Sequence, residues 1–170
     1  MLTVVLIGAE STGKTTLAKS LADHYGTAWV PEYVRGFVAR TQRAPRLADV
    51  PYIAAGHLAS VEAARETANN LLILDTDLLS TVVYSRYYFG HCPPEVETLA
   101  HTHRAALYLL ADVAIPWTPD PGQRDGAEVR AAIQPQMLAM LEAVQAHWTR
   151  VAGTPSERLA QACAAIDAVR

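Results

Sequence analysis

The chain has 170 residues, of which 51% are hydrophobic, and a net charge of −3. This length suits one domain, 1–170, with a sizeable buried core. The small negative charge argues against nucleic acid as the main partner, because phosphate backbones call for a basic surplus. No apolar run approaches the ~20 residues that span a bilayer, and the N-terminus shows no secretory signal. We therefore expect a cytoplasmic protein without a membrane partner, and reduced thiols at Cys92 and Cys163.

The chain alternates short apolar runs with amphipathic segments. In chain order, the expected elements are a strand at 2–7, a helix to Tyr25 closed by Gly26, a strand at 27–30, a helix within 33–48, a helix at 49–69 capped by Asp49, a strand at 71–74, helices at 78–88 and 94–103, a strand at 105–110, a loop at 116–126, a helix to His147, a strand at 148–152 and a helix at 155–169. Strands alternating with long helices predict right-handed βαβ units. We expect an α/β fold: a five-stranded parallel sheet with helices on both faces.

The segment after the first strand matches the phosphate-binding pattern G-x-x-x-x-G-K-[ST] through Gly8, Gly13, Lys14 and Thr15. Glycines let the backbone turn its N–H groups toward phosphate oxygens, and the following helix adds the positive end of its dipole. Lys14 is one of only two lysines beside twelve arginines, which argues against an accidental match. The residues expected to cradle the phosphates of ATP are Gly8, Glu10, Ser11, Thr12, Gly13, Lys14, Thr15 and Thr16.

Acidic residues follow two of the expected strands, where ligands of open α/β sheets bind. Asp75 directly follows four apolar residues and, with the Thr15 hydroxyl, is expected to hold Mg²⁺; the alternative is a helix cap. Asp77 fits a helix cap as well as it fits a substrate contact. Glu32 is a candidate general base for an acceptor hydroxyl, with Arg35 fixing substrate, although an acid there also complements the helix dipole.

Other parts of the chain offer further candidates for this site. The loop at 116–126 resembles a lid, and its Arg124 is expected to stabilise the transferring phosphoryl group. Trp117 is expected either in the core or against a substrate ring, and Gly153, Thr154 and Arg158 are weaker candidates for contacting the ATP base. The pair His101 and His103 lacks a third ligand and is expected at the surface, whereas His57 is expected to be packed or exposed rather than catalytic.

Several short blocks occur in a fixed order: the phosphate loop, Glu32-Tyr33-x-Arg35, Gly56-His57, Asp75-Thr76-Asp77 and Trp117…Asp120…Gly122-x-Arg124. Together they resemble the P-loop ribosylnicotinamide kinase domain of the bacterial multifunctional NAD-biosynthesis regulators. The resemblance covers nearly the whole chain. It implies a three-layer P-loop kinase fold and a substrate site that includes Tyr33. In that family an aromatic residue precedes the Glu-Tyr block, where this chain has Pro31, and Trp29 or Trp117 is expected to substitute.

The resemblance implies phosphorylation of the 5′-hydroxyl of nicotinamide riboside, a step of NAD salvage, with ATP and Mg²⁺ as cofactors. A kinase for another nucleoside or nucleotide remains an alternative, as does a regulatory P-loop NTPase. A guanine-reading Asn-Lys-x-Asp segment is missing from residues 110–116, which argues against a GTPase. The expected partner is a small nucleoside-like substrate, and whether the chain forms a homo-oligomer stays open.

Overall fold

The computed structural model describes residues 1–114 and 126–170. Within them, five strands form one parallel sheet in the order β2-β3-β1-β4-β5, which confirms the expected α/β class. The strands are β1 (Leu2–Ile7), β2 (Trp29–Val30), β3 (Leu71–Asp75), β4 (Leu107–Ala111) and β5 (Trp148–Val151). β1 is central because Val4 lies opposite both Ile73 of β3 and Leu107 of β4. β1, β3 and β4 are apolar and largely buried, as in parallel sheets that are covered on both faces.

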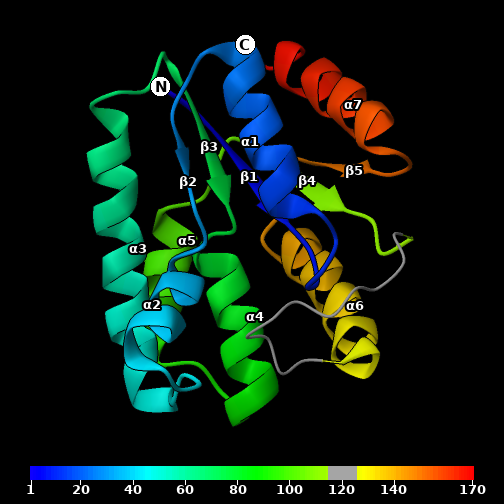
Figure 1. Cartoon of the computed structure of the whole chain (residues 1–170). Coiled ribbons are helices and arrows are strands. Elements are labelled where there is room, and N and C mark those ends of the chain that lie inside the picture. Colours follow the sequence, from blue (N-terminus) through cyan, green and yellow to red (C-terminus); the bar gives the residue numbers. More distant parts are fainter. Residues whose placement is uncertain (115–125) are drawn as a thin grey trace.

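The connections between strands are helical. The helices are α1 (Lys14–Tyr25), α2 (Tyr33–Thr41), the short 3₁₀ turn η1 (Leu47–Asp49), α3 (Val50–Arg65), α4 (Leu78–Phe89), α5 (Pro94–Thr102), α6 (Ala127–Ala143) and α7 (Pro155–Asp167). α1 and α7 cover one face of the sheet (Figure 1), where Leu17, Leu21 and Ile166 join a core with alternate strand residues. α3, α4, α5 and α6 pack on the opposite face around a second, larger core. The result is the expected three-layer arrangement.

Some boundaries differ from the sequence prediction, and local hydrogen bonds explain why. β4 begins at Leu107 rather than at 105, because the Ala105 N–H is bonded to the Tyr108 hydroxyl. The helix before β5 ends at Ala143 rather than near 147, since Gln145 adopts a left-handed φ of 52°. The helix expected at 49–69 stops at Arg65.

Asp49 lies at the start of α3 but does not cap it with its side chain. Its carboxylate instead accepts two bonds from Arg43, at 2.6 and 2.9 Å, and one from the Arg46 N–H at 2.8 Å. These bonds lower the pKa of Asp49 to about 2, chiefly through Arg43. The prediction that the Asp49 side chain caps this helix was therefore wrong, because its carboxylate is bonded to Arg43 and to the Arg46 N–H instead.

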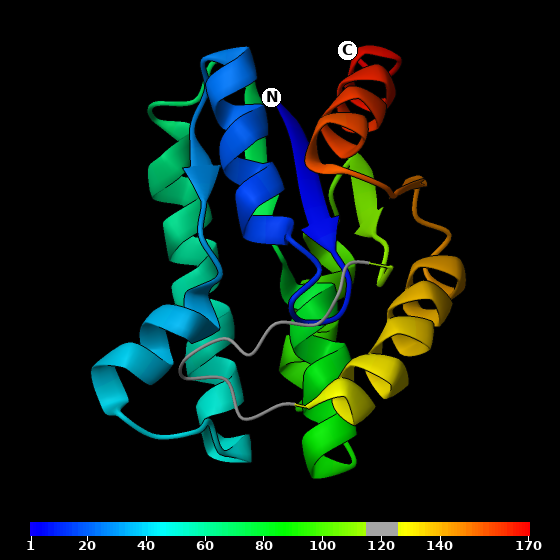
Figure 2. The same ribbon diagram turned by 45° about the vertical axis from the view of Figure 1, so that its right-hand side comes forward.

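The carboxyl ends of the parallel strands meet at one edge of the sheet (Figures 1 and 2). The loop after β1, the start of α2 and the turn after β3 all emerge there, so the fold brings these three segments together. Among the described residues, no helix is both long enough and apolar enough to cross a membrane.

Candidate active site

The loop between β1 and α1 has the backbone shape that its sequence predicts. Gly8 and Gly13 adopt positive φ angles of 139° and 77°, and Ser11 lies at 52°. α1 begins at Lys14, directly after Gly13, so its free N–H groups face the loop. This is the arrangement that binds phosphate oxygens at a helix N-terminus.

The buried carbonyl of Ala9 organises the interior of this loop. It accepts a bond from Lys14 Nζ at 2.7 Å and another from Thr12 Oγ1 at 2.8 Å. The Lys14 side chain therefore lies folded over the loop, largely out of solvent. A triphosphate would compete with this carbonyl for the ammonium group.

Thr15 and Asp75 meet directly at the end of β3. Thr15 Oγ1 donates to Asp75 Oδ2 at 2.5 Å, and Asp75 is 1% exposed. Asp75 Oδ1 is buried and has no hydrogen-bond partner among the described residues. A buried carboxylate oxygen without a donor, next to a hydroxyl, fits a hard cation with oxygen ligands, so this pair suits Mg²⁺.

Glu32 lies on the other side of the loop, immediately before α2. Its side chain is 16% exposed and its Oε2 is 3.7 Å from Arg35 Nε. Glu32 directly precedes α2, but its side chain makes no capping hydrogen bond to that helix. Burial raises the pKa of Glu32; Lys14 opposes the rise, Asp75 adds to it and Arg35 opposes it. A carboxylate with a raised pKa beside a phosphate loop suits proton abstraction from a hydroxyl.

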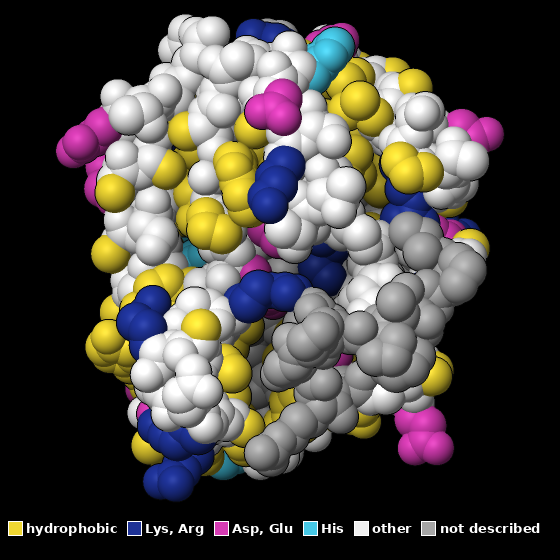
Figure 3. All heavy atoms as spheres, in the orientation of Figure 1, with side chains coloured by type: hydrophobic (Ala, Val, Ile, Leu, Met, Phe, Trp, Pro, Cys, Tyr) yellow, Lys and Arg dark blue, Asp and Glu magenta, His cyan; other side chains and the backbone are white. Residues whose placement is uncertain are grey.

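Lys14, Thr15, Glu32 and Arg35 line one pocket of about 210 Å³. The described residues that line it are Glu10, Ser11, Thr12, Gly13, Lys14, Thr15, Thr16, Glu32 and Arg35. In Figure 3 basic side chains gather around a hollow near the centre of this face. The pocket thus brings seven of the eight expected phosphate residues together with Glu32 and Arg35.

Asp77 points into the fold. Its Oδ1 accepts from the N–H groups of Leu79 and Ser80, and its Oδ2 accepts from the Tyr108 hydroxyl at 2.8 Å. Burial raises its pKa to about 6, against the opposing effect of these bonds. Of the two alternatives for Asp77, the structure shows the helix cap; a substrate contact would require these bonds to open.

Thr76, between the two aspartates, has a φ of 68°, which is unusual for a β-branched residue. Its N–H donates to Leu6 O at 3.0 Å, which extends the pairing of β3 with β1 by one residue. This strained turn sends the two neighbouring carboxylates to different places: Asp75 to Thr15, and Asp77 to the start of α4.

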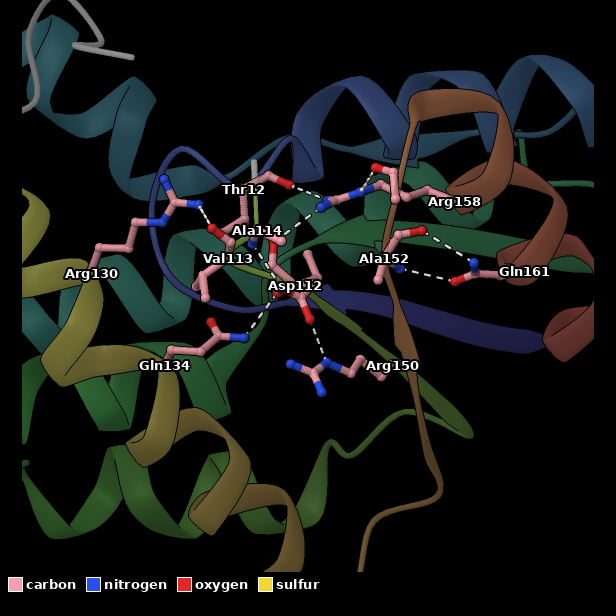
Figure 4. A network of polar contacts seen from close by, with 12 residues as sticks. Thr12, Asp112, Val113, Ala114, Arg130, Gln134, Arg150, Ala152, Arg158 and Gln161 are labelled. Atoms are coloured by element: carbon pink, nitrogen blue, oxygen red, sulfur yellow. Dashed lines mark hydrogen bonds and ion pairs between the residues drawn. The ribbon is translucent and has the colours of Figure 1, made fainter. Parts of the chain in front are cut away.

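Arg158 lies behind the phosphate loop. Its guanidinium donates to the carbonyls of Thr12 at 2.7 Å, Asp112 at 3.1 Å and Gly153 at 3.0 Å, and the residue is 4% exposed (Figure 4). Thr154 caps α7 through a reciprocal pair of bonds with Glu157. Arg158 thus fastens the loop to the ends of β4 and β5, and this geometry gives no support to its expected contact with the ATP base.

Tyr33 packs between α2 and α3. Its hydroxyl bonds to Tyr52, and Arg40 stacks over its ring at 5.3 Å. A Cβ at Gly56 of α3 would lie 2.1 Å from Tyr33 Cζ, so only glycine admits the ring. This contact accounts physically for the glycine of the Gly56-His57 block.

Gly56→Ala should therefore lower the free energy of unfolding by about 1–3 kcal/mol, because the ring must move or α2 must shift. Gly36→Ala is the matched control: the new Cβ meets only the end of Arg40, at 3.2 Å, so relief from a helical glycine should stabilise by about 0.5–1 kcal/mol. Urea denaturation measures both. Equal effects of the two substitutions would contradict the role assigned to Tyr33.

The remaining sequence candidates lie elsewhere. Trp29 packs on the α1 face, with Lys19 5.5 Å above its ring, so the expectation that it replaces the missing aromatic at Pro31 is not supported. Trp117 and Arg124, with nearly all of the expected lid at 116–126, lie outside the described residues. His57 is buried, and burial lowers its pKa to about 4, which confirms the packed interpretation.

His101 and His103 are exposed, as expected. The described residues contain no group of three or more His, Cys, Asp or Glu side chains that could hold a metal ion. Cys92 is buried and Cys163 half-buried, and both are free thiols.

The sheet order, the phosphate loop and the carboxylates at the strand ends define a P-loop protein with the kinase fold. The model of the AAA domain family AAA_28 matches residues 3–158, and the chain belongs to this family.

Relatives of known function are longer. The chain is 32% identical over 145 residues to the trifunctional NAD biosynthesis/regulator protein NadR of Salmonella typhimurium, covering 82% of this chain and 35% of that protein. For NadR of Escherichia coli, the identity is 32% over 154 residues, covering 88% and 38%. The chain thus spans little more than a third of these relatives and is homologous to that part of them.

Solved structures share the fold. A crystal structure of NadR protein in complex with NAD and AMP-PNP aligns with a TM-score of 0.81 and 21% identity over 98% of this chain and 49% of that one. Deoxyadenosine kinase from M. mycoides aligns with a TM-score of 0.70 and 9% identity over 98% of this chain and all of that one. At these identities the likeness concerns the fold, and it confirms the expected P-loop kinase architecture.

Proposed function

We propose that this chain is an ATP-dependent phosphotransferase that phosphorylates the 5′-hydroxyl of nicotinamide riboside, giving nicotinamide mononucleotide. The observation that carries the proposal is the shared pocket, where the phosphate loop faces Glu32 and Arg35. Homology to part of NadR supports it, and a NadR crystal structure holds NR. A cytoplasmic location accompanies the proposed reaction, because ATP is the phosphoryl donor.

One set of residues binds the phosphates of ATP, and Glu32 acts on the acceptor hydroxyl. The loop N–H groups and Lys14 hold the β- and γ-phosphates. Glu32 accepts the proton of the acceptor hydroxyl, whose oxygen forms a bond to the γ-phosphorus while the bond to the bridging oxygen of ADP breaks. Thr15 and Asp75 would hold Mg²⁺, which when bound neutralises charge on the phosphates.

The acceptor side is proposed to include Arg35, Tyr33 and Trp117, with Arg124 on the transferring group, whereas Asp77 caps α4 and is not assigned to it. Among the described residues of this group, Arg35 lines the pocket and approaches Glu32. Tyr33 supports the start of α2, which carries both residues. The base of the acceptor is then selected by side chains other than Trp29.

Two alternatives remain as outcomes of one experiment. Structures with this fold include deoxyadenosine kinase and a thymidylate kinase with a TM-score of 0.69, so another nucleoside or nucleotide is a second class of acceptor.

The purified chain is incubated with ATP, Mg²⁺ and a panel of nucleosides and nucleotides, and mass spectrometry identifies the products. We expect nicotinamide mononucleotide as the main product. Preferred phosphorylation of another compound would reassign the acceptor, and no phosphorylated product at all would favour a regulatory NTPase.

A further inference from the structure

β1 and β4 separate where the phosphate loop begins. Ile7 lies opposite Leu110 in the parallel pairing, and the ladder ends there. Just beyond it, the side-chain amide of Gln134, on α6, lies between the two backbones. Gln134 Oε1 accepts from the Ala9 N–H at 2.8 Å, and Gln134 Nε2 donates to the Ala111 carbonyl at 2.9 Å. The amide supplies one acceptor and one donor, as a peptide group of a neighbouring strand would.

The junction has little free space. A Cβ at Gly8 would lie 3.0 Å from Ala111 O and 3.4 Å from Gln134 Oε1, and Gly8 itself has a φ of 139°. Ala9 and Ala111 are both 0% exposed. Water therefore has little access to either backbone group, and the side chain of Gln134 satisfies both.

Ala9 connects Gln134 to the phosphate-binding machinery. Its carbonyl is the acceptor for both Lys14 Nζ and Thr12 Oγ1. Gln134 holds the same residue through its N–H, so it fixes the backbone to which Lys14 and Thr12 attach. Figure 4 shows Gln134, on α6, and Arg158, on α7, approaching the segment that follows β4 from different elements.

We propose that Gln134 is a positioning residue for triphosphate binding: its amide bridges Ala9 and Ala111 and holds the phosphate loop in its binding shape before the nucleotide arrives. The inference rests on the proposed function in that it takes a triphosphate as the ligand of the loop. Gln134 itself is not among the described residues that line the phosphate pocket.

The first test replaces the amide by an apolar side chain of similar length. Gln134→Met should weaken binding of both Mg·ATP and magnesium tripolyphosphate, by about tenfold each, since the loop loses a buried bond without losing a ligand group. At saturating ATP, the KM for the acceptor should stay within about twofold of wild type, because the acceptor side is untouched. Gln136→Met is the matched control, since Gln136 is exposed on the same helix and donates to Ala132 O within that helix.

The second test observes the bond itself. The Ala9 amide proton should exchange with solvent much faster in Gln134→Met than in wild type, while Val5 within β1 stays protected. Gln134→Glu keeps an acceptor for Ala9 and loses the donor to Ala111, so it should retain most of this protection. If Gln134→Met fails to fold, Ala9 exchange and tripolyphosphate binding are still compared among wild type, Gln134→Glu and Gln136→Met.

The outcomes separate the two proposals. If wild type binds neither ATP nor tripolyphosphate, the proposed function fails, and Ala9 exchange still decides whether Gln134 holds the loop. If wild type binds both and Gln134→Met binds them equally well, the positioning role is overturned. Unchanged Ala9 exchange in Gln134→Met would also overturn it.

Discussion

Glu32→Gln should lower kcat by about 10²–10⁴-fold while leaving the affinity for ATP nearly unchanged. The amide keeps the shape of the side chain but cannot accept the proton of the acceptor hydroxyl. Steady-state kinetics with the acceptor identified in the product screen, together with calorimetric ATP binding, measure the two quantities. A variant that keeps most of its turnover would leave Glu32 without the role of base.

The chain offers a close control for this substitution. Glu62 pairs with Arg65 three residues later at 3.5 Å, as Glu32 pairs with Arg35, but its side chain is 82% exposed and lies on α3. Glu62→Gln should leave kcat within about twofold of wild type, since an exposed ion pair contributes little. A comparable loss in both variants would point to a general effect of charge rather than to proton transfer.

The pH profile follows from the same carboxyl group. A base must be ionised to act, and burial raises the pKa of Glu32. Activity is therefore present above this raised pKa and is lost as the pH falls through it. The acidic limb of kcat/KM should lie at higher pH than for an exposed glutamate, and it should disappear from the residual activity of Glu32→Gln.

Lys14→Met should reduce kcat/KM by about 10²–10³-fold, because the variant lacks the cation that compensates negative charge on the transferring phosphoryl group. Binding of tripolyphosphate should weaken as well, which calorimetry measures. Lys19→Met, at the only other lysine, is the natural control: its ammonium lies over Trp29, on the outside of α1, and its loss should change neither quantity. Similar losses in both variants would contradict the assigned role of Lys14.

The phosphate loop was predictable because its information is local. Eight consecutive residues supply the positive φ angles, the lysine and the helix start, and the structure has them as the sequence indicates. The α/β class was equally accessible, because buried strands and long helices leave periodic patterns. The strand-end position of Asp75 followed from the same alternation.

The contacts that hold the loop were not accessible in this way. Gln134 and Ala9 are 125 residues apart, and Arg158 and Thr12 are 146 apart, so no motif joins them. From its place after β5, Arg158 is a weak candidate for contact with the ATP base, whereas in the structure it donates to three backbone carbonyls. Next to Gln134, Pro135 lies inside α6, although proline lacks the backbone N–H that a helix interior uses. This departure marks the helix as unusual, but it does not indicate that α6 contacts the phosphate loop.

The position of β1 at the middle of the sheet has a consequence for engineering. On its β3 side lie Glu32 and Arg35, at the start of α2, which packs on α3. On its β4 side lie Gln134 of α6 and Arg158 of α7, which hold the phosphate loop. Substitutions within residues 29–66 should thus change the acceptor preference without weakening triphosphate binding. Chimeras that exchange this segment between homologues provide a direct route to new acceptor preferences.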